Sequence, residues 1–225
     1  MAERPEGAAR KLPAELARLL HDLRGPLNSA VMHLEVLKRT VSDDPSSADS
    51  LRTVLQQLVR LSEMLPAAFT VAALETGPFA HVSLRQVVER ARQEAGLGTV
   101  RIVGDAWPEV RGDIALLTLG IAELMRNAVE ATAPDGRAPE VSASRTDEGV
   151  VVNVRDFGTG LPTTNPKLLI RLLHSTKGGH RGVGLVIAER VARLHGGTLS
   201  FEGLADGARV GLRLPDQEAS RASSV

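Results

Sequence analysis

A histidine near the N-terminus lies in a stretch whose composition is unusual for a helix: HDLRGPLN, from His21 to Asn28. The flanking residues have helical periodicity, but a Gly and a Pro inside a helix destabilise it by about 1 and about 3 kcal/mol relative to Ala. Because Pro26 lacks an N–H, the carbonyl of Asp22 loses its helical partner and the helix should bend beside His21. Gly25 lies one turn from His21 and leaves that face of the helix open.

The neighbour of this histidine suggests what chemistry it could perform. A carboxylate beside an imidazole, as in Asp22 and His21, can fix the tautomer of the ring and accept a proton when the other ring nitrogen attacks an electrophile. The Gly-Pro pair is then explained if a bulky group must reach the histidine. The alternative is a bent helix of a bundle with no chemistry, and this stretch alone does not separate the two interpretations.

Two motifs in the second half of the chain could bind a nucleotide. In ELMRNAVEA, Glu123 and Asn127 lie four residues apart on one helix face. A carboxylate can hold a water or the shell of a metal, and an Asn oxygen can coordinate Mg²⁺. In RDFGTG, Asp156 follows a strand-like segment and can accept a hydrogen bond from an exocyclic amine such as that of adenine, while Gly158 and Gly160 let the backbone approach a ligand closely. Singly, each motif also fits a polar helix surface or a turn that closes a strand.

A third motif, STKGGHRGVGL, combines glycines with a cation. Gly182 and Gly184 open a predicted helix, whose N-terminus can bind phosphate, and Lys177 supplies a point charge. A glycine pair before a helix is weak evidence by itself. Three such motifs in this order indicate a nucleotide site.

The segment that must position His21 is a predicted hairpin of two long helices. Apolar residues recur at alternating steps of four and three along two segments, as in a packed bundle. The first seam is Leu16, Leu20, Leu23, Leu27, Ala30, Leu34, Leu37 and Val41, and the second is Val54, Leu58, Leu61, Leu65, Ala68 and Ala72. The polar SDDPSS between them favours a turn and antiparallel packing. Since one hairpin cannot cover both seams, we expect a homodimer with a four-helix bundle.

The three later motifs lie in a segment of mixed helical and strand patterns. Helical periodicity is found at 82–95, 113–132 and 182–197, a strand pattern at 99–103, and hairpin patterns at 140–158 and 197–215. We therefore predict an α+β chain: a helical hairpin over 12–75, a linker containing ETGPF, and an α+β domain over 79–215. The polar tail, 216–225, is expected to be disordered.

Composition narrows the classes of function. The chain has 225 residues, 27 basic and 27 acidic, so its formal net charge of zero gives no field that would attract nucleic acid. It has no Cys, which excludes disulfides and thiolate metal sites. Its apolar runs fall short of the roughly 18 residues of a membrane helix, and the N-terminus lacks the apolar centre of a signal peptide. We expect a cytoplasmic protein without membrane insertion. Zinc is not expected, because His33, His81 and His174 lack ligand spacing and His195 is interpreted as the end of a helix.

Together these motifs resemble the catalytic core of sensor histidine kinases of two-component systems. HDLRGPL resembles their phosphoacceptor box, and the later motifs resemble their asparagine box and two glycine boxes, so the resemblance covers about residues 12 to 214. It implies a dimerisation and histidine-phosphotransfer hairpin followed by a Bergerat-type ATP-binding domain, an α/β sandwich. It also implies autophosphorylation of His21 from Mg-ATP and transfer to an aspartate on the receiver domain of a response regulator.

The resemblance also assigns roles to individual residues. Asp22 takes the acid/base position, Glu123 the place of a catalytic carboxylate in related ATPases, Asn127 the Mg²⁺ ligand, and Asp156 the adenine reader. The remaining cofactor-binding positions, which shape the pocket and its lid, are Gly158, Gly160, Thr176, Lys177, Gly182, Gly184 and Leu185. The nucleotide site must swing to the histidine, so Gly77-Pro78 is expected to act as a hinge.

Departures from the family pattern predict differences in activity. Members with phosphatase activity usually have Thr or Asn four residues after the histidine, and Gly25 there predicts weak or absent dephosphorylation of the partner. The usual lid phenylalanines are missing, and Ile170, Leu173 and His174 stand there, while His180 replaces a frequent glycine before Gly182. We expect the lid to pack less firmly around the nucleotide.

Two other functions fit parts of the pattern. A phosphotransfer or scaffold protein of the same shape would have a degenerate ATP site, and His21 would only relay phosphate between receivers. A stand-alone ATPase or serine kinase, such as an anti-sigma factor, would not need the HDLRGPL hairpin. Nucleotide binding separates the relay from the kinase. No sensor precedes Leu12, so the signal is expected from a longer system or from a separate sensor or regulator protein.

Overall fold

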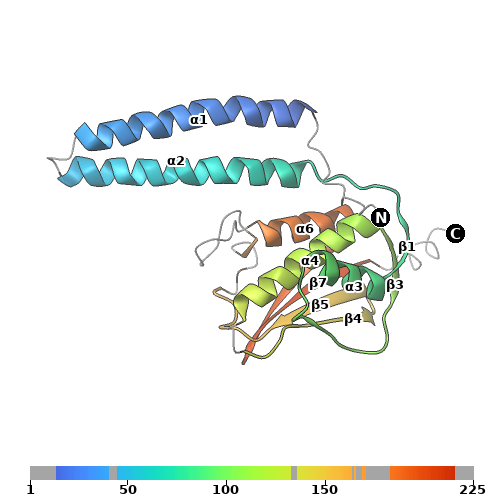
Figure 1. Cartoon of the computed structure of the whole chain (residues 1–225). Coiled ribbons are helices and arrows are strands. Elements are labelled where there is room, and N and C mark those ends of the chain that lie inside the picture. Colours follow the sequence, from blue (N-terminus) through green and yellow to red (C-terminus); the bar gives the residue numbers. More distant parts are fainter. Residues whose placement is uncertain are drawn as a thin grey trace, which may run out of the picture. The chain divides into compact units, whose positions relative to one another are not determined.

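The computed structural model describes residues 14–40, 45–132, 136–163, 165, 169–170 and 183–215. The chain divides into two compact units between Leu74 and Glu75, and each unit is a separate body of its own architecture (Figure 1).

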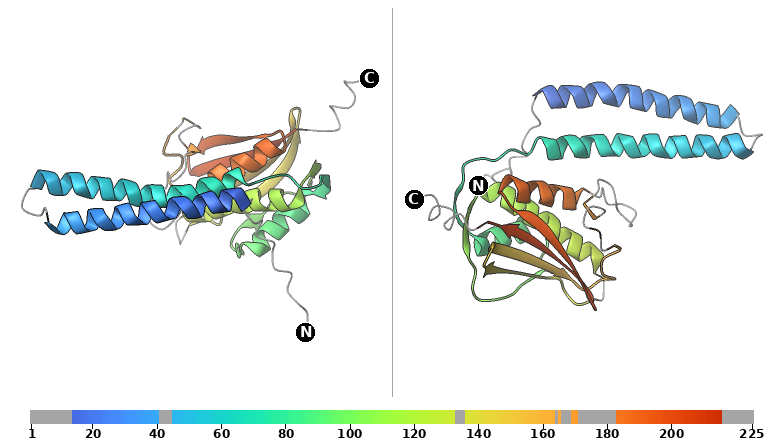
Figure 2. Two further views of the ribbon diagram at one scale, coloured as in Figure 1. Left: turned by 90° about the horizontal axis from the view of Figure 1, so that it is seen from above. Right: turned by 180° about the vertical axis from the view of Figure 1, so that it is seen from behind.

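The first unit is a helical hairpin. Helix α1 (Ala14–Thr40) and helix α2 (Pro45–Ala72) pack side by side in opposite directions (Figures 1 and 2). Helix α1 remains helical through Gly25 and Pro26. Helix α2 begins at Pro45, where a proline is tolerated because the first N–H groups of a helix have no helical acceptor, so the predicted turn contributes its last residues to the helix.

The hairpin leaves apolar side chains on its surface. Leu55, beside the second predicted seam, is buried. Among the residues of this unit whose side chains the structure describes, the exposed large apolar ones are Leu23, Met32, Val36, Leu37, Val54, Val59 and Leu61. Leu23, Leu37, Val54 and Leu61 belong to the predicted seams, so packing of the two helices on each other does not cover the seams.

The second unit is built on a mixed sheet whose described strands run in the order β2-β4-β5-β7-β6. The strands are β2 (Arg101–Ile102), β4 (Glu140–Thr146), β5 (Gly149–Asp156), β6 (Thr198–Leu204) and β7 (Gly207–Leu214). Strand β2 pairs parallel with β4, and the remaining pairs are antiparallel. The two predicted hairpins, β4–β5 and β6–β7, are confirmed.

Helices cover one face of this sheet. Helix α3 (Leu84–Glu94) packs on α4 (Ile114–Ala131), and α4 and α6 (Gly184–Leu194) pack on each other and on the strands (Figures 1 and 2). The alternation of β5 explains this layering, because every second residue faces the helices. Val150, Val152, Val154 and Asp156 are buried, whereas Val151, Asn153 and Arg155 are only partly buried. The α+β fold class, with a helical unit followed by an α/β-sandwich, is confirmed.

A short second sheet was not predicted from the sequence. Strand β1 (Ala80–Ser83) pairs antiparallel with β3 (Glu109–Gly112). The sequence pattern assigned Val82 and Ser83 to a helix, but α3 begins at Leu84. The predicted strand at 99–103 is only two residues long in the structure. Four-residue strands give little periodicity, and the partner of β1 lies more than twenty residues along the chain, so this ladder leaves no local pattern.

Candidate functional site

The N-terminal histidine is accessible on its helix. His21 is exposed on α1, and a Cβ added to Gly25, one turn away, would meet no atom within 4 Å. This agrees with the prediction that the helix face beside His21 is open. The side chain of Asp22 lies outside the described residues.

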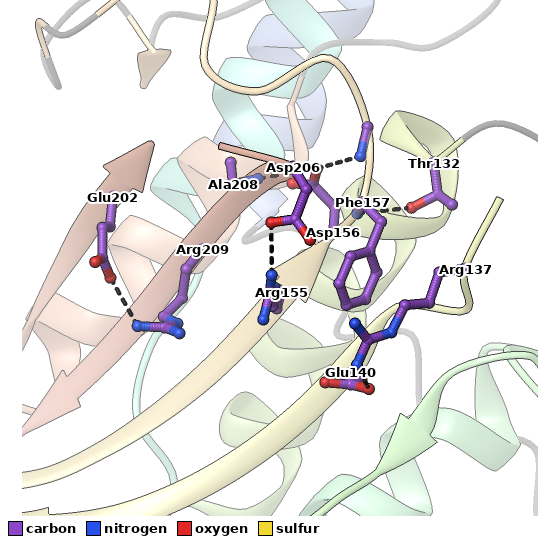
Figure 3. A network of polar contacts seen from close by, with 11 residues as sticks. Thr132, Arg137, Glu140, Arg155, Asp156, Phe157, Glu202, Asp206, Ala208 and Arg209 are labelled. Atoms are coloured by element: carbon purple, nitrogen blue, oxygen red, sulfur yellow. Dashed lines mark hydrogen bonds and ion pairs between the residues drawn. The ribbon is translucent and has the colours of Figure 1, made fainter. Parts of the chain in front are cut away.

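Asp156 ends strand β5, and its carboxylate is fixed from two directions. The residue is 6% exposed. Its Oδ1 accepts hydrogen bonds from the backbone N–H of Gly158 at 3.0 Å and of Ala208 at 3.2 Å (Figure 3). Ala208 is the cross-strand partner of Asp156 on β7, which the sequence motif could not indicate. Among the described residues, both of these donors bind Oδ1 and neither binds Oδ2.

The turn after Asp156 requires glycine at two predicted positions. A Cβ on Gly158 would lie 2.1 Å from the carbonyl oxygen of Ala131, the last residue of α4. Gly160 has φ +81°, a left-handed conformation that side chains other than glycine rarely adopt. Gly158 therefore lets the turn pass against the end of α4, and the predicted close approach of this backbone to a ligand stays a prediction.

Helix α4 carries two further candidate residues. Its N-cap is Asp113, whose side chain accepts hydrogen bonds from the N–H groups of Ala115 and Leu116. Glu123 lies in the middle of the helix and pairs with Arg126, with Nη1 and Oε1 2.5 Å apart. Asn127, one turn after Glu123, is partly buried.

The start of helix α6 meets Glu123. A Cβ on Gly184 would lie 2.9 Å from Glu123 Oε2, so the first residue of α6 lies against the carboxylate of Glu123. Leu185, the next residue, is partly buried. Residues from all three predicted motifs therefore lie along one helix: Gly184 beside Glu123, and Gly158 beside Ala131.

Several predicted residues cannot be placed in this arrangement. Thr176, Lys177 and Gly182 lie outside the described residues, as do Leu173, His174 and His180 of the predicted lid. Within the described part of the chain, no cluster of three or more His, Asp or Glu side chains could hold a metal ion. No described helix is both long enough and apolar enough to cross a bilayer.

A buried histidine connects the segment after Leu74 to the start of α4. The sequence did not predict this contact. His195, at the end of α6, is 3% exposed. Its Nε2 accepts the N–H of Asp113 at 3.0 Å, and its Nδ1 lies 2.8 Å from the carbonyl oxygen of Val191, to which it must donate. The ring also stacks on Phe79, with centroids 5.0 Å apart. Asp113 Oδ2 in turn accepts the N–H of Gly77 at 2.6 Å.

Two known families match the chain, one mainly in each of the two units. A family described as the His Kinase A (phospho-acceptor) domain matches residues 14–77. A second, described as the histidine kinase-, DNA gyrase B-, and HSP90-like ATPase, matches residues 112–218.

Curated relatives have the same pair of regions within longer proteins. The nitrogen regulation protein NtrY of Azorhizobium caulinodans is 25% identical over 88% of this chain and 28% of its own length. The signal transduction histidine-protein kinase AfsQ2 of Streptomyces coelicolor is 28% identical over 93% of this chain and 42% of its own length. Sporulation kinase C of Bacillus subtilis is 27% identical over 85% of this chain and 46% of its own length. The chain thus spans less than half of each of these relatives.

Solved structures with the same fold support this division. The ATP-binding domain of PrrB from Mycobacterium tuberculosis matches 62% of this chain and 98% of its own, at 26% identity and a TM-score of 0.51. Full-length ShkA in complex with AMPPNP matches 89% of this chain and 45% of its own, at 25% identity and a TM-score of 0.52.

Proposed function

Because this chain belongs to the sensor histidine kinases and carries their catalytic core, we propose that it phosphorylates its own His21 from Mg-ATP and passes the phosphoryl group to an aspartate of a response-regulator receiver domain. The observation that supports this most directly is the convergence on α4. The start of α6 lies at Glu123 and the turn after Asp156 lies at Ala131, in a unit that follows a helix with an exposed histidine.

Asp156 is proposed to read adenine. A carboxylate can accept a hydrogen bond from the exocyclic amine of adenine but offers no donor to a carbonyl at that ring position. The two backbone N–H groups on Oδ1 hold the carboxylate in one orientation, which favours selection of one base. ShkA, which matches 89% of this chain, is known in complex with AMPPNP, an ATP analogue.

The residues of α4 fit a role for Mg²⁺ bound with the nucleotide. Asn127 offers an amide oxygen and Glu123 a carboxylate one turn away, and Mg²⁺ prefers oxygen ligands while keeping waters and substrate phosphates in its shell. We propose Asn127 as a direct ligand and Glu123 as an acid/base or water-holding residue. The ion would neutralise charge on the transferring phosphoryl group. Thr176, Lys177 and Gly182 are proposed phosphate-binding residues by motif alone, with Gly160, Gly184 and Leu185 shaping the pocket.

His21 is proposed to attack through one ring nitrogen while Asp22 accepts the proton from the other. The new bond joins the imidazole nitrogen to the γ-phosphorus, the bond from that phosphorus to the bridging oxygen breaks, and ADP leaves. The open face at Gly25 gives the nucleotide-binding unit room to approach.

A homodimer is proposed from the exposed seam of the hairpin. Leu23, Leu37, Val54 and Leu61 are between 37 and 49% exposed although they occupy seam positions. Burial of apolar area from water contributes about 25 cal/mol per Å². A dimer in which a second hairpin covers these side chains would therefore be stabilised. The result would be the four-helix bundle predicted from the heptads.

The pivot between the two units is proposed to precede Gly77. The sequence suggested Gly77-Pro78 as the hinge, but Gly77 donates to Asp113 and Phe79 stacks on His195. Both contacts fasten the linker to the nucleotide-binding unit. Leu74 donates to the carbonyl of Val71 in the helical unit, so movement of the nucleotide-binding unit toward His21 should come from rotation at residues 75–76.

The decisive experiment is transfer from [γ-³²P]ATP and Mg²⁺ to the purified full chain, beside His21→Ala, with acid and alkali treatment of the product. Label that is lost in acid, survives alkali and is missing from His21→Ala would support the proposal. If a folded dimer that binds ATP takes up no label, the autokinase proposal is wrong for the chain as it stands. If it takes up no label and binds no nucleotide, His21 would be left as a phosphate relay. Subsequent transfer is tested by adding receiver domains of response regulators and measuring loss of label from His21.

A further inference from the structure

Phe157 occupies an unusual place beside the proposed adenine reader. It is one of four Phe residues in the chain and directly follows Asp156. Along β5, Asp156 faces the helices and Arg155 faces the opposite side of the sheet. The ring of Phe157 lies near the guanidinium of Arg155, with 4.5 Å between Cζ and the ring centroid, so it lies on the side of the sheet away from the helices (Figure 3).

Two cations hold this ring. The guanidinium of Arg137 lies 4.2 Å from the ring centroid, and that of Arg155 lies at 4.5 Å. Both distances are within the range of a cation–π attraction. One cation from the segment before β4 and one from the end of β5 thus contact the same aromatic ring.

Each cation is itself anchored by a carboxylate. Arg137 Nη2 lies 2.9 Å from Glu140 Oε1 at the start of β4. Arg155 Nη2 lies 2.6 Å from Asp206 Oδ1 in the β6–β7 turn. Among the described residues, the Nε of Arg155 is buried without a hydrogen-bond partner, so the ion pair and the ring are the contacts that direct this guanidinium. The ring of Phe157 is therefore fixed relative to three separate segments of the sheet.

The backbone of Phe157 is tied to α4 on the other side. Its N–H donates to Thr132 Oγ1 at 3.4 Å, and the Thr132 hydroxyl donates to the carbonyl of Ala128 at 2.9 Å. The next N–H, that of Gly158, is one of the two donors that hold Asp156 Oδ1. Rotation of Phe157 would therefore move a donor on which the orientation of the carboxylate depends.

We propose that Phe157 is a positioning residue for Asp156: its ring, held by Arg137 and Arg155, sets the turn that orients the adenine-reading carboxylate. This inference rests on the proposed nucleotide-binding function. On this inference, discrimination between bases depends in part on residues that do not touch the nucleotide. These are Arg137 and Arg155, which hold Phe157 on the face of the sheet away from the helices.

The test measures how well the full chain distinguishes ATP from purine riboside triphosphate, which lacks the 6-amino group, by titration calorimetry with Mg²⁺. Phe157→Leu keeps an apolar side chain but removes the π face. We expect its Kd for ATP to rise about fivefold and its preference for ATP to fall by a similar factor, the effect of losing both cation–π contacts at the low end of their strength, about 0.5 kcal/mol each. Phe157→Tyr keeps the ring and should restore the preference. Arg137→Met, which removes one cation but keeps an extended side chain, should give a smaller loss in the same direction.

Two further variants serve as the negative and the positive control for this measurement. Trp107→Leu removes another cation–π pair, with Arg85 at 5.7 Å, on the loop between β2 and β3, and should leave the preference unchanged. Asp156→Asn should abolish it. If Asp156→Asn loses the preference while Phe157→Leu, folded by circular dichroism, stays within twofold of the wild type, the positioning role is wrong and the nucleotide site stands. If the wild type itself binds ATP and the analogue equally, the adenine-reading role fails together with this inference.

Discussion

Replacing His195 by Phe should destabilise the nucleotide-binding unit at the end of α4 opposite the proposed adenine reader. The variant keeps an aromatic ring to stack on Phe79 but removes both ring nitrogens. The N–H of Asp113, which donates to Nε2 at 3.0 Å, would lose its partner. Asp113 is 5% exposed and His195 3% exposed, so water cannot readily take the place of the imidazole.

The magnitude follows from these two bonds. A buried donor left without a partner costs about 1–3 kcal/mol, and the lost bond from Nδ1 to Val191 adds about 1 kcal/mol. The Val191 carbonyl still accepts the backbone N–H of residue 195 at 3.3 Å, so it is not left unpaired. The sum is about 2–4 kcal/mol, which corresponds to a fall in Tm of about 5–15 °C for a unit of this size.

Differential scanning calorimetry of the full chain measures this effect. His81→Phe is the matched control, because His81 is exposed and surface substitutions usually change stability by no more than about 0.5 kcal/mol. His195→Gln should recover part of the loss, since its amide oxygen can accept the Asp113 N–H. A Tm for His195→Phe within 2 °C of the wild type would refute the reasoning. Hydrogen exchange adds a local readout: freeing Asp113 should reduce protection of the Gly77 amide, which donates to Asp113 Oδ2.

Three further predictions follow from individual contacts. Gly158→Ala places a Cβ 2.1 Å from the Ala131 oxygen, so the Kd for ATP should rise at least about tenfold, whereas Gly98→Ala, where a Cβ meets no atom within 4 Å, should bind normally. Leu61→Glu should shift the dimer to monomer in sedimentation equilibrium, and the equally exposed Val59→Glu, off the seam, should not. Gly25→Asn fits the open helix face and should accelerate dephosphorylation of a phosphorylated receiver, which the wild type is expected to perform weakly or not at all. Fast dephosphorylation by the wild type, unchanged in Gly25→Asn, would contradict the assigned role of this position.

Elements that depend on local pattern could be predicted from the sequence. The β4–β5 hairpin follows from a valine-rich, strand-like run next to a DEG turn, and helix α4 follows from its periodicity and from Asp113, which caps it. The glycines of the turn after Asp156 could be singled out because glycine permits close contacts and positive φ, as found at Gly158 and Gly160. These are features that one residue and its near neighbours determine.

Features that depend on distant pairing could not be predicted. His195 looked like the end of a helix, and it does end α6, but its main contact is with Asp113, 82 residues earlier in the chain. Ala208 supports Asp156 because β5 pairs with β7 in one register, and a shift by one residue would present a different side of the strand. The β1–β3 ladder was missed for the same reason, since each strand gains its partner only when the chain has folded.

Helix α4 explains why local motifs far apart in sequence form one site. With 18 residues and a rise of 1.5 Å per residue, it is about 27 Å long. Its N-cap, Asp113, binds Gly77 and His195, its middle meets Gly184 at Glu123, and its end meets the turn after Asp156. The linker anchor and the proposed adenine reader therefore lie at opposite ends of one helix. Because a packed helix resists bending, a change in how the linker docks would reach the nucleotide site as a movement of this whole helix rather than through a chain of side chains.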